Sequence, residues 1–247
     1  MHKLTLGSLF TGIGGLDIGL ENSGMQVSWQ VEKNEYCRNV LEKRWPEINR
    51  WDDVKTFPPG PADDWKVDVI AGGFPCQDIS NAGLRKGLSG NRSGLWFEML
   101  RVICFLRPKF IVLENVPALL IRGFGDVLGG LAEAGYDAEW QVLSASMFGA
   151  PHIRERIFII AYPNGFRFQG WTYESERSEM WEDGKKQLAR FLQTGVRVDI
   201  PEIGFFRMDD GSSNRMDRVR ALGNAVVPYV AESIGRSIVQ SAQKYLY

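Results

Sequence analysis

Short apolar runs alternate with stretches of helical periodicity over the first two thirds of the chain. Mostly apolar runs predict strands at 4–9, 27–32, 67–71, 109–114, 139–144 and 156–161. Helices are predicted between them at 15–23, from the cap residue Asn34 to about residue 45, from the cap residue Ser93 to Pro108, and near 124–133. This alternation predicts an α/β fold with a mostly parallel, doubly wound sheet and helices on both faces.

The pattern stops after residue 162 and resumes near the end of the chain. Residues 164 to about 214 are polar, charged and aromatic without a clear period, whereas residues 226–243 have the spacing of an amphipathic helix. We therefore expect three parts: a main α/β domain over 1–161, a small irregular module over 162–214 and a C-terminal segment over 215–247.

The composition excludes several classes of protein. Of the 247 residues 44% are hydrophobic, which suffices for a sizeable core, but no apolar run is long enough to span a membrane. We expect a soluble, cytoplasmic protein. The three cysteines and two histidines have neither disulfide nor metal-ligand spacing, so we expect no metal site. The formal net charge of −1 implies that any nucleic acid is bound through a local basic patch.

The stretch LFTGIGGLDIG forms a glycine-rich turn after the first predicted strand. Glycines at this place in a doubly wound sheet let a ligand approach the backbone. Glu32, twenty residues after Gly12, is placed to accept hydrogen bonds from ribose hydroxyls, and Asp53 can accept one from an adenine amino group. Asp17 stands where the dinucleotide fingerprint has its third glycine, which disfavours a nicotinamide oxidoreductase. The alternative is a tight turn only, with Glu32 and Asp53 solvated.

Cys76, in the stretch GGFPCQDIS, follows a predicted strand at the sheet edge where ligands bind. A thiol with an ordinary pKa is about 3% thiolate at neutral pH and is still a strong nucleophile. Cys37 and Cys104 fall within predicted helices, and we expect both to be buried structural residues. Glu114 ends another predicted strand, where burial raises a carboxyl pKa and allows it to act as an acid. A helix cap or a salt-bridge partner is the alternative role for Glu114.

The ordered series FTGIGG, Glu32, Asp53, GFPCQ, ENV, HIRER and ALGNAVVP resembles the cytosine-5 DNA methyltransferases. It covers residues 4–161 and about 215–240, roughly four fifths of the chain. The resemblance implies a Rossmann-like methyltransferase fold and transfer of a methyl group from S-adenosylmethionine to C5 of a flipped-out cytosine, with S-adenosylhomocysteine as the product. It implies that Cys76 attacks C6, that Glu114 holds the base, and that Arg154 and Arg156 support the base and the closed loop.

The resemblance also implies a set of cofactor contacts from the turns after the strands and from the returning C-terminal segment. These are Phe10, Thr11, Gly12, Ile13, Gly14, Gly15, Glu32, Asp53, Val54, Gly73, Pro75, Leu95, Asn224 and Ala225. Its partner is expected to be double-stranded DNA, with a cognate restriction endonuclease as a further candidate, and we expect a monomer. The family's arginine motif begins with glutamine, whereas this chain has His152.

DNA contacts are expected from two basic regions. The segment 80–92 has glycines and charges typical of a loop that closes over DNA, although an ordinary surface loop is the alternative. The module over 162–214 is short for target recognition. The stretch RMDDGSSNRMDRVRALGNAVVP, residues 207–228, looks like the abbreviated form seen in phage-type members. The expected contacts are Ser80, Arg85, Lys86, Arg92, Arg215 and Arg218.

Three other functions remain as alternatives. A methyltransferase acting on transfer RNA has the same chemistry, and a nucleic-acid-binding protein can keep this fold without activity. A dinucleotide oxidoreductase is disfavoured by Asp17 and by the motifs that follow. The target DNA sequence does not follow from the chain.

Overall fold

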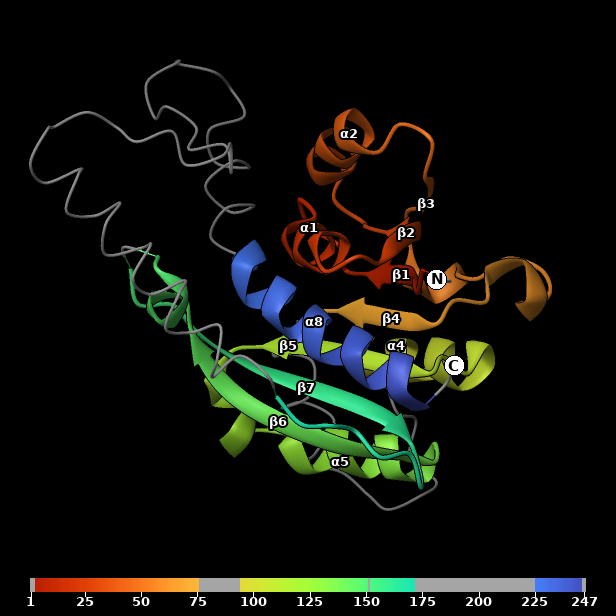
Figure 1. Cartoon of the computed structure of the whole chain (residues 1–247). Helices are drawn as coiled ribbons and strands as arrows, with labels where there is room; N and C mark the ends of the chain where they lie inside the picture. Colours follow the sequence, from red (N-terminus) through yellow and green to blue (C-terminus); the bar gives the residue numbers. More distant parts are fainter. Residues whose placement is uncertain (1–2, 76–93, 151, 172–224, 246–247) are drawn as a thin grey trace, which may run out of the picture.

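A seven-stranded sheet in the order β3-β2-β1-β4-β5-β7-β6 organises the protein (Figure 1). The computed structural model describes residues 3–75, 94–150, 152–171 and 225–245. Strands β3, β2, β1, β4 and β5 are parallel, and β7 runs antiparallel to both β5 and β6. The strands are β1 (Thr5–Leu9), β2 (Gln26–Val31), β3 (Asn49–Trp51), β4 (Val69–Gly72), β5 (Phe110–Asn115), β6 (Tyr136–Ser144) and β7 (Glu155–Pro163).

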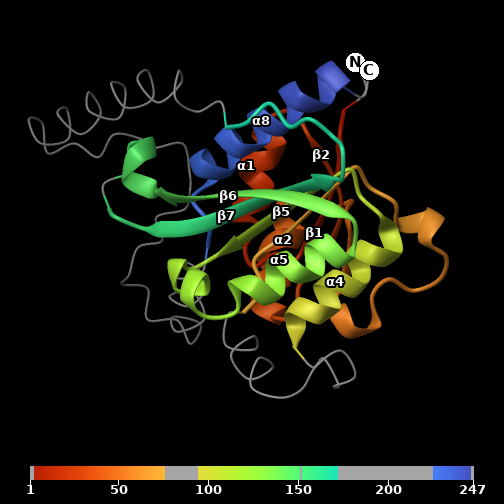
Figure 2. The same cartoon turned by 90° about the horizontal axis from the view of Figure 1, so that it is seen from below.

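Helices cover both faces of the sheet, which confirms the predicted α/β architecture (Figure 2). One face carries α1 (Gly15–Asn22), α2 (Glu35–Arg44) and α8 (Pro228–Tyr245), and the other carries α4 (Leu95–Leu106) and α5 (Phe124–Glu133). Short 3-10 turns complete the described chain: η1 (Val54–Thr56), η2 (Ala62–Trp65), η3 (Pro117–Ile121) and η4 (Ala145–Phe148). Alternate residues of the central strands face opposite helical layers, so β4 and β5 are buried from both sides, whereas the edge strands β3 and β6 keep exposed residues.

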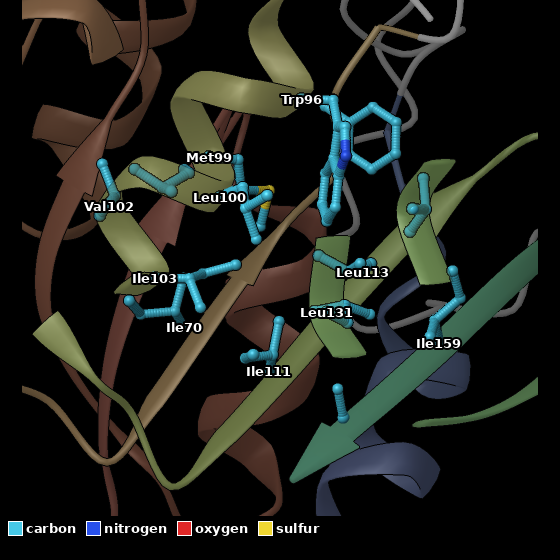
Figure 3. Close-up of a cluster of buried hydrophobic side chains, with 14 of the residues drawn as sticks. Ile70, Trp96, Met99, Leu100, Val102, Ile103, Ile111, Leu113, Leu131 and Ile159 are labelled. Atoms are coloured by element: carbon cyan, nitrogen blue, oxygen red, sulfur yellow. The ribbon is translucent and has the colours of Figure 1, made fainter. Parts of the chain in front are cut away.

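The layer between the sheet and α4 is filled by large apolar side chains (Figure 3). Trp96, Met99 and Ile103 are fully buried there, at the helical spacing that predicted α4. Two expectations for this helix are wrong. Its N-cap is Gly94 and not Ser93, and Cys104 is exposed, because it lies on the side of the helix away from the sheet.

The other predicted elements agree with the structure within a few residues. Asn34 caps α2 by accepting a hydrogen bond from the Cys37 amide at 3.0 Å, and Cys37 is buried as expected. The edge strand β3 was not predicted, because its sequence, NRW, contains no apolar run. The parts predicted over 162–214 and at Asn224 fall largely outside the described residues, so the division of the chain at 161 and 214 stays a prediction.

The C-terminal helix α8 packs closely against α1. A Cβ atom at Gly19 would lie 2.2 Å from the carbonyl oxygen of Pro228, and one at Gly15 would lie 2.3 Å from that of Val226. Real Cβ atoms do not approach backbone oxygens this closely, so both positions require glycine. The segment that begins at Ala225 therefore enters α8 directly beside the glycine-rich turn.

Candidate functional site

The loops that carry the predicted site residues leave the same edge of the sheet. Strands β2, β1, β4 and β5 are parallel, and the chain order reverses between the neighbours β1 and β4. In open α/β sheets the crevice beyond the carboxyl ends at this reversal is where ligands bind. The glycine-rich turn follows β1, Glu32 follows β2, Gly73 follows β4 and Glu114 lies at the end of β5.

The glycine-rich turn has an unusual backbone. Phe10, Gly12 and Gly14 have φ angles of 55°, 59° and 84°, all in the left-handed region. For a residue with a side chain such as Phe10, this conformation costs on the order of 1–3 kcal/mol, and such strain is typical of ligand sites. A Cβ atom at Gly12 would have no neighbour within 4 Å, so the backbone there borders open space.

Glu32 joins this turn to the start of α2. Its carboxylate accepts hydrogen bonds from the amides of Gly12 and Asn34, both at 2.7 Å. A carboxylate offers about four acceptor positions, so Glu32 keeps capacity for further donors such as hydroxyls. It is therefore anchored at the turn, in contrast to the alternative of a freely solvated side chain.

Asp53 and Val54 form a second wall of the same region. Asp53 caps η1 by accepting a hydrogen bond from the Lys55 amide at 3.0 Å, and the Lys33 ammonium lies 3.4 Å from its other oxygen. These contacts, the backbone bond first, lower the pKa of Asp53. Val54 is buried, and Arg101 of α4 donates to its carbonyl oxygen at 2.7 Å. The loop is thus held against α4.

A buried ion pair lies at the end of β5. Glu114 is 8% exposed, and Arg156 of β7 lies 2.8 Å from its Oε1. Burial raises the pKa of Glu114 and the nearby charges of Arg156 and Arg154 oppose the rise, leaving the pKa above its usual value as predicted. A Cβ atom at Gly73 would lie 2.5 Å from Oε2 of Glu114, so a side chain at residue 73 would displace the carboxyl from this position. Glu114 therefore combines the two roles that its sequence position allows: its pKa is raised, and it is the partner of Arg156 in a salt bridge.

Arg154 lies two residues before Arg156, where its charge acts on the same pair. Burial, and then the charge of Arg156, lower the pKa of Arg154, while Glu114 opposes them. The intervening Glu155 is exposed, as the alternation of a strand requires. His152 is also exposed. The charges of both arginines of the HIRER stretch therefore act on one carboxyl, and Arg156 contacts it directly.

Asn115 is a functional candidate that sequence reasoning left without a role. It is buried, its Nδ2 donates to the Phe74 carbonyl oxygen at 2.8 Å, and its Oδ1 accepts from the Val116 amide at 2.9 Å. This side chain ties β5 to the backbone two residues before Cys76. The available signal was a second polar residue, directly after Glu114, at the end of a buried strand.

The sequence model of the C-5 cytosine-specific DNA methylase family matches residues 4–202. The chain belongs to this family. It is 30% identical over 224 residues to the type II methyltransferase M.BsuFI of Bacillus subtilis, covering 87% of this chain and 53% of the relative. It is 31% identical over 214 residues to the orphan methyltransferase M.SPRI of Bacillus phage SPR, covering 83% and 47%. The chain thus spans about half the length of these curated relatives.

Solved structures of methyltransferases have the same fold as this family member. A putative DNA modification methyltransferase encoded within an E. coli prophage aligns with a TM-score of 0.55 and 26% identity, covering 68% of this chain and 49% of that one. A Spodoptera frugiperda DNMT2 mutant aligns with a TM-score of 0.57 and 22% identity, covering 68% and 52%. Both confirm the predicted Rossmann-like methyltransferase fold.

The structure of this methylase-family chain places part of the expected site at one sheet edge and leaves the rest undescribed. The described members come from the turns after β1, β2, β3 and β4, the start of α4, the end of β5, the start of β7 and the segment before α8. The members outside the described residues are Cys76, Ser80, Arg85, Lys86, Arg92, Arg215, Arg218 and Asn224.

The described residues contain neither a metal-binding cluster nor a membrane-spanning helix. Within these ranges, no group of three or more His, Cys, Asp or Glu side chains is arranged to hold a metal ion. None of the helices that the structure describes has the length and apolar character needed to cross a bilayer.

Proposed function

We propose that this chain transfers a methyl group from S-adenosylmethionine to C5 of a cytosine in double-stranded DNA. The family match supports the reaction class, and one geometric observation carries the proposal. The raised-pKa carboxyl of Glu114 is held by Arg156 and packed against Gly73, three residues before the nucleophile candidate Cys76. An acid at the end of β5 and a nucleophile in the segment that follows the neighbouring strand β4 can act on opposite sides of one pyrimidine ring.

The cofactor fits the residues present at the glycine-rich turn. Gly12 borders open space, Phe10 is held in a conformation typical of ligand sites, and Glu32 has acceptor capacity for ribose hydroxyls. Asp53, Val54, Gly73, Pro75 and Leu95 provide the adjoining wall, and Ala225 begins the segment beside Gly15. When bound, S-adenosylmethionine supplies the methyl group.

Cys76 and Glu114 divide the activation of the base between them. The Cys76 thiolate forms a bond to C6, and the electron pair of the C5–C6 double bond becomes available at C5. Glu114 stabilises the added electron density by sharing its proton with N3 of the ring and accepting a hydrogen bond from the exocyclic amine. After methylation at C5, loss of the C5 proton restores the double bond and expels the Cys76 thiolate.

Arg156 and Arg154 hold this acid in place. Arg156 fixes one oxygen of Glu114, and the positive charge of both arginines suits the carbonyl oxygen of a bound cytosine, which lies on the same side of the ring as N3. Asn115 contributes by holding the Phe74 backbone, and so limits where Cys76 lies relative to Glu114. Glu114 and Asn115 belong to β5, and the two arginines lie at the start of β7. The position of the acid relative to the nucleophile therefore depends on these two strands.

The DNA-binding part of the proposal rests on residues beyond the described ranges. Because the base lies inside the duplex, it must be flipped out at a cost of a few kcal/mol. We assign this step to the segment 80–92 with Ser80, Arg85, Lys86 and Arg92. Target recognition is assigned to 162–214 and to Arg215 and Arg218, and Asn224 to the cofactor pocket. A cognate restriction endonuclease is a candidate partner, because several similar proteins are type II methyltransferases.

The test uses the purified chain, S-adenosylmethionine and double-stranded DNA, with mass spectrometry of the nucleosides. We expect 5-methylcytosine with the wild type and none with Cys76→Ala. A duplex containing 5-fluorocytosine in the target should give a covalent protein–DNA adduct, because fluorine blocks the final elimination. Methylation of transfer RNA instead of DNA, or retained turnover by Cys76→Ala, would contradict the proposal.

A further inference from the structure

The first turn of α1 contains a buried carboxylate that the proposed mechanism does not use. Asp17 is fully buried. Its Oδ1 accepts a hydrogen bond from the Ser8 hydroxyl at 2.6 Å, and its Oδ2 accepts one from Nε2 of Gln30 at 2.8 Å. Burial raises the pKa of Asp17 to about 6, although both hydrogen bonds favour its ionised form. Burying a carboxylate destabilises the folded state more than burying an apolar side chain with apolar neighbours would, so this group calls for an explanation.

The partners of Asp17 form a row across three neighbouring strands. Ser8 of β1 is in register with Gln30 of β2, and Gln30 is in register with Arg50 of β3. Arg50 Nε donates to Oε1 of Gln30 at 3.1 Å, and its Nη2 donates to the carbonyl oxygens of Leu41, at 3.0 Å, and Trp45. One polar network therefore connects α1, three strands and the end of α2.

Each strand of this row leads directly into a loop of the proposed cofactor site. Ser8 lies two residues before Phe10, and Gln30 lies two residues before Glu32. The Thr11 amide donates to the Val31 carbonyl oxygen at 3.2 Å, so the first two loops touch just beyond the row. The network lies beneath these loops, within the layer between the sheet and α1.

We propose that Asp17 is a positioning residue for cofactor binding, whose carboxylate aligns the glycine-rich turn with Glu32 by holding Ser8 and Gln30 together. The inference rests on the proposed function, because it takes the cofactor to bind at this edge. The strained Phe10 backbone explains why the glycine-rich turn needs such support, since a strained conformation persists only where its surroundings hold it firmly. Fully paired buried networks specify one arrangement, whereas partly paired ones do not.

The consequence of losing the carboxylate follows from this geometry. Asp17→Ala leaves the Ser8 hydroxyl and the Gln30 amide without an acceptor inside the protein, so both groups must move to find one. That movement shifts β1 relative to β2 where the Gly12 amide meets Glu32 across 2.7 Å. Asp17→Asn keeps one acceptor for Gln30 and offers a donor to the Ser8 oxygen, so it preserves the alignment.

The experiment measures S-adenosylhomocysteine binding to the full chain by calorimetry. We expect Asp17→Ala to weaken affinity about tenfold or more, and Asp17→Asn to stay within about threefold of the wild type. In steady-state assays Asp17→Ala should raise the KM for S-adenosylmethionine while kcat changes less than about twofold. Val127→Ala in α5 is the matched control, because it removes buried apolar volume on the opposite face of the sheet. It should lower Tm without changing affinity.

The outcomes separate the two proposals. A wild type that binds no S-adenosylhomocysteine refutes the proposed cofactor site itself. A wild type that binds, together with a folded Asp17→Ala that binds equally well, overturns the positioning role. Equal weakening by Val127→Ala at a matched loss of Tm also overturns it, because the effect is then general destabilisation. If Asp17→Ala does not fold, Ser8→Ala decides: a several-fold loss of affinity supports the role and unchanged affinity refutes it.

Discussion

The buried pair of Glu114 and Arg156 allows a quantitative prediction for Arg156→Ala. The side chains are 10% and 18% exposed, and the Nε–Oε1 distance is 2.8 Å. Removing one member of a buried pair typically costs about 3–5 kcal/mol, because the other charge stays buried without its partner. Arg154 still acts on Glu114, and Glu114 can take up a proton, so we expect a loss of about 2–3 kcal/mol in the free energy of unfolding at pH 8.

The loss should depend on pH in a defined direction. Without Arg156, burial raises the folded-state pKa of Glu114 further, while its unfolded-state value is unchanged. A carboxyl with a raised folded-state pKa favours the folded state at low pH, and this contribution is lost as pH rises through that pKa. The deficit of Arg156→Ala should therefore be smaller at pH 5.5 than at pH 8.

Urea unfolding of the full chain at the two pH values measures both effects. Glu114→Gln is the matched control, since it removes the charge that Arg156→Ala leaves unpaired. The double variant should be more stable than the sum of the two single losses predicts, with a coupling of about 1–3 kcal/mol. A deficit below about 0.5 kcal/mol at pH 8, or one equal at both pH values, would refute this account of the pair.

Three further predictions concern Cys76, Asn115 and Asp17. Cys76→Ala should abolish methylation with little change in S-adenosylhomocysteine affinity, and residual turnover above the no-enzyme rate would argue against the nucleophile. Asn115→Leu leaves the Phe74 carbonyl and the Val116 amide without their partner, so kcat should fall about tenfold or more with unchanged cofactor affinity; a wild-type kcat would contradict this. Because the pKa of Asp17 is raised to about 6, wild-type stability should fall by up to about 3 kcal/mol between pH 4 and pH 7 relative to Asp17→Asn, and parallel stability curves would contradict it.

The order of elements could be predicted because β4, β5 and β7 contain continuous apolar runs, and because segments of helical periodicity separate most of the strands. β5 is entirely buried and is preceded by Pro108, so both its identity and its start were visible in the sequence. β3 was missed because a three-residue edge strand with an exposed Asn49 has no such signal. Cys104 was misplaced because a strongly apolar helix still has an outer side, where Phe105 is also exposed.

The site could be predicted only as a set of strand ends. Parallel strands bring the turns after β1, β2 and β4 together whatever their side chains, so Gly12, Glu32 and Gly73 could be grouped in advance. The hydrogen bonds that hold them depend on register between strands far apart in the sequence. The contact of Asp17 with Gln30 and that of Asn115 with Phe74 are of this kind. From the sequence, Asp17 indicates only that the dinucleotide fingerprint is incomplete.

The measurement that tests the central claim most directly is bisulfite sequencing of genomic DNA from a host without cytosine methylation. The host would express either the wild-type chain or Cys76→Ala at matched soluble levels. The proposed function predicts 5-methylcytosine at a short recurring sequence with the wild type alone. Soluble wild-type protein that binds S-adenosylhomocysteine but leaves the genome unmethylated would contradict it.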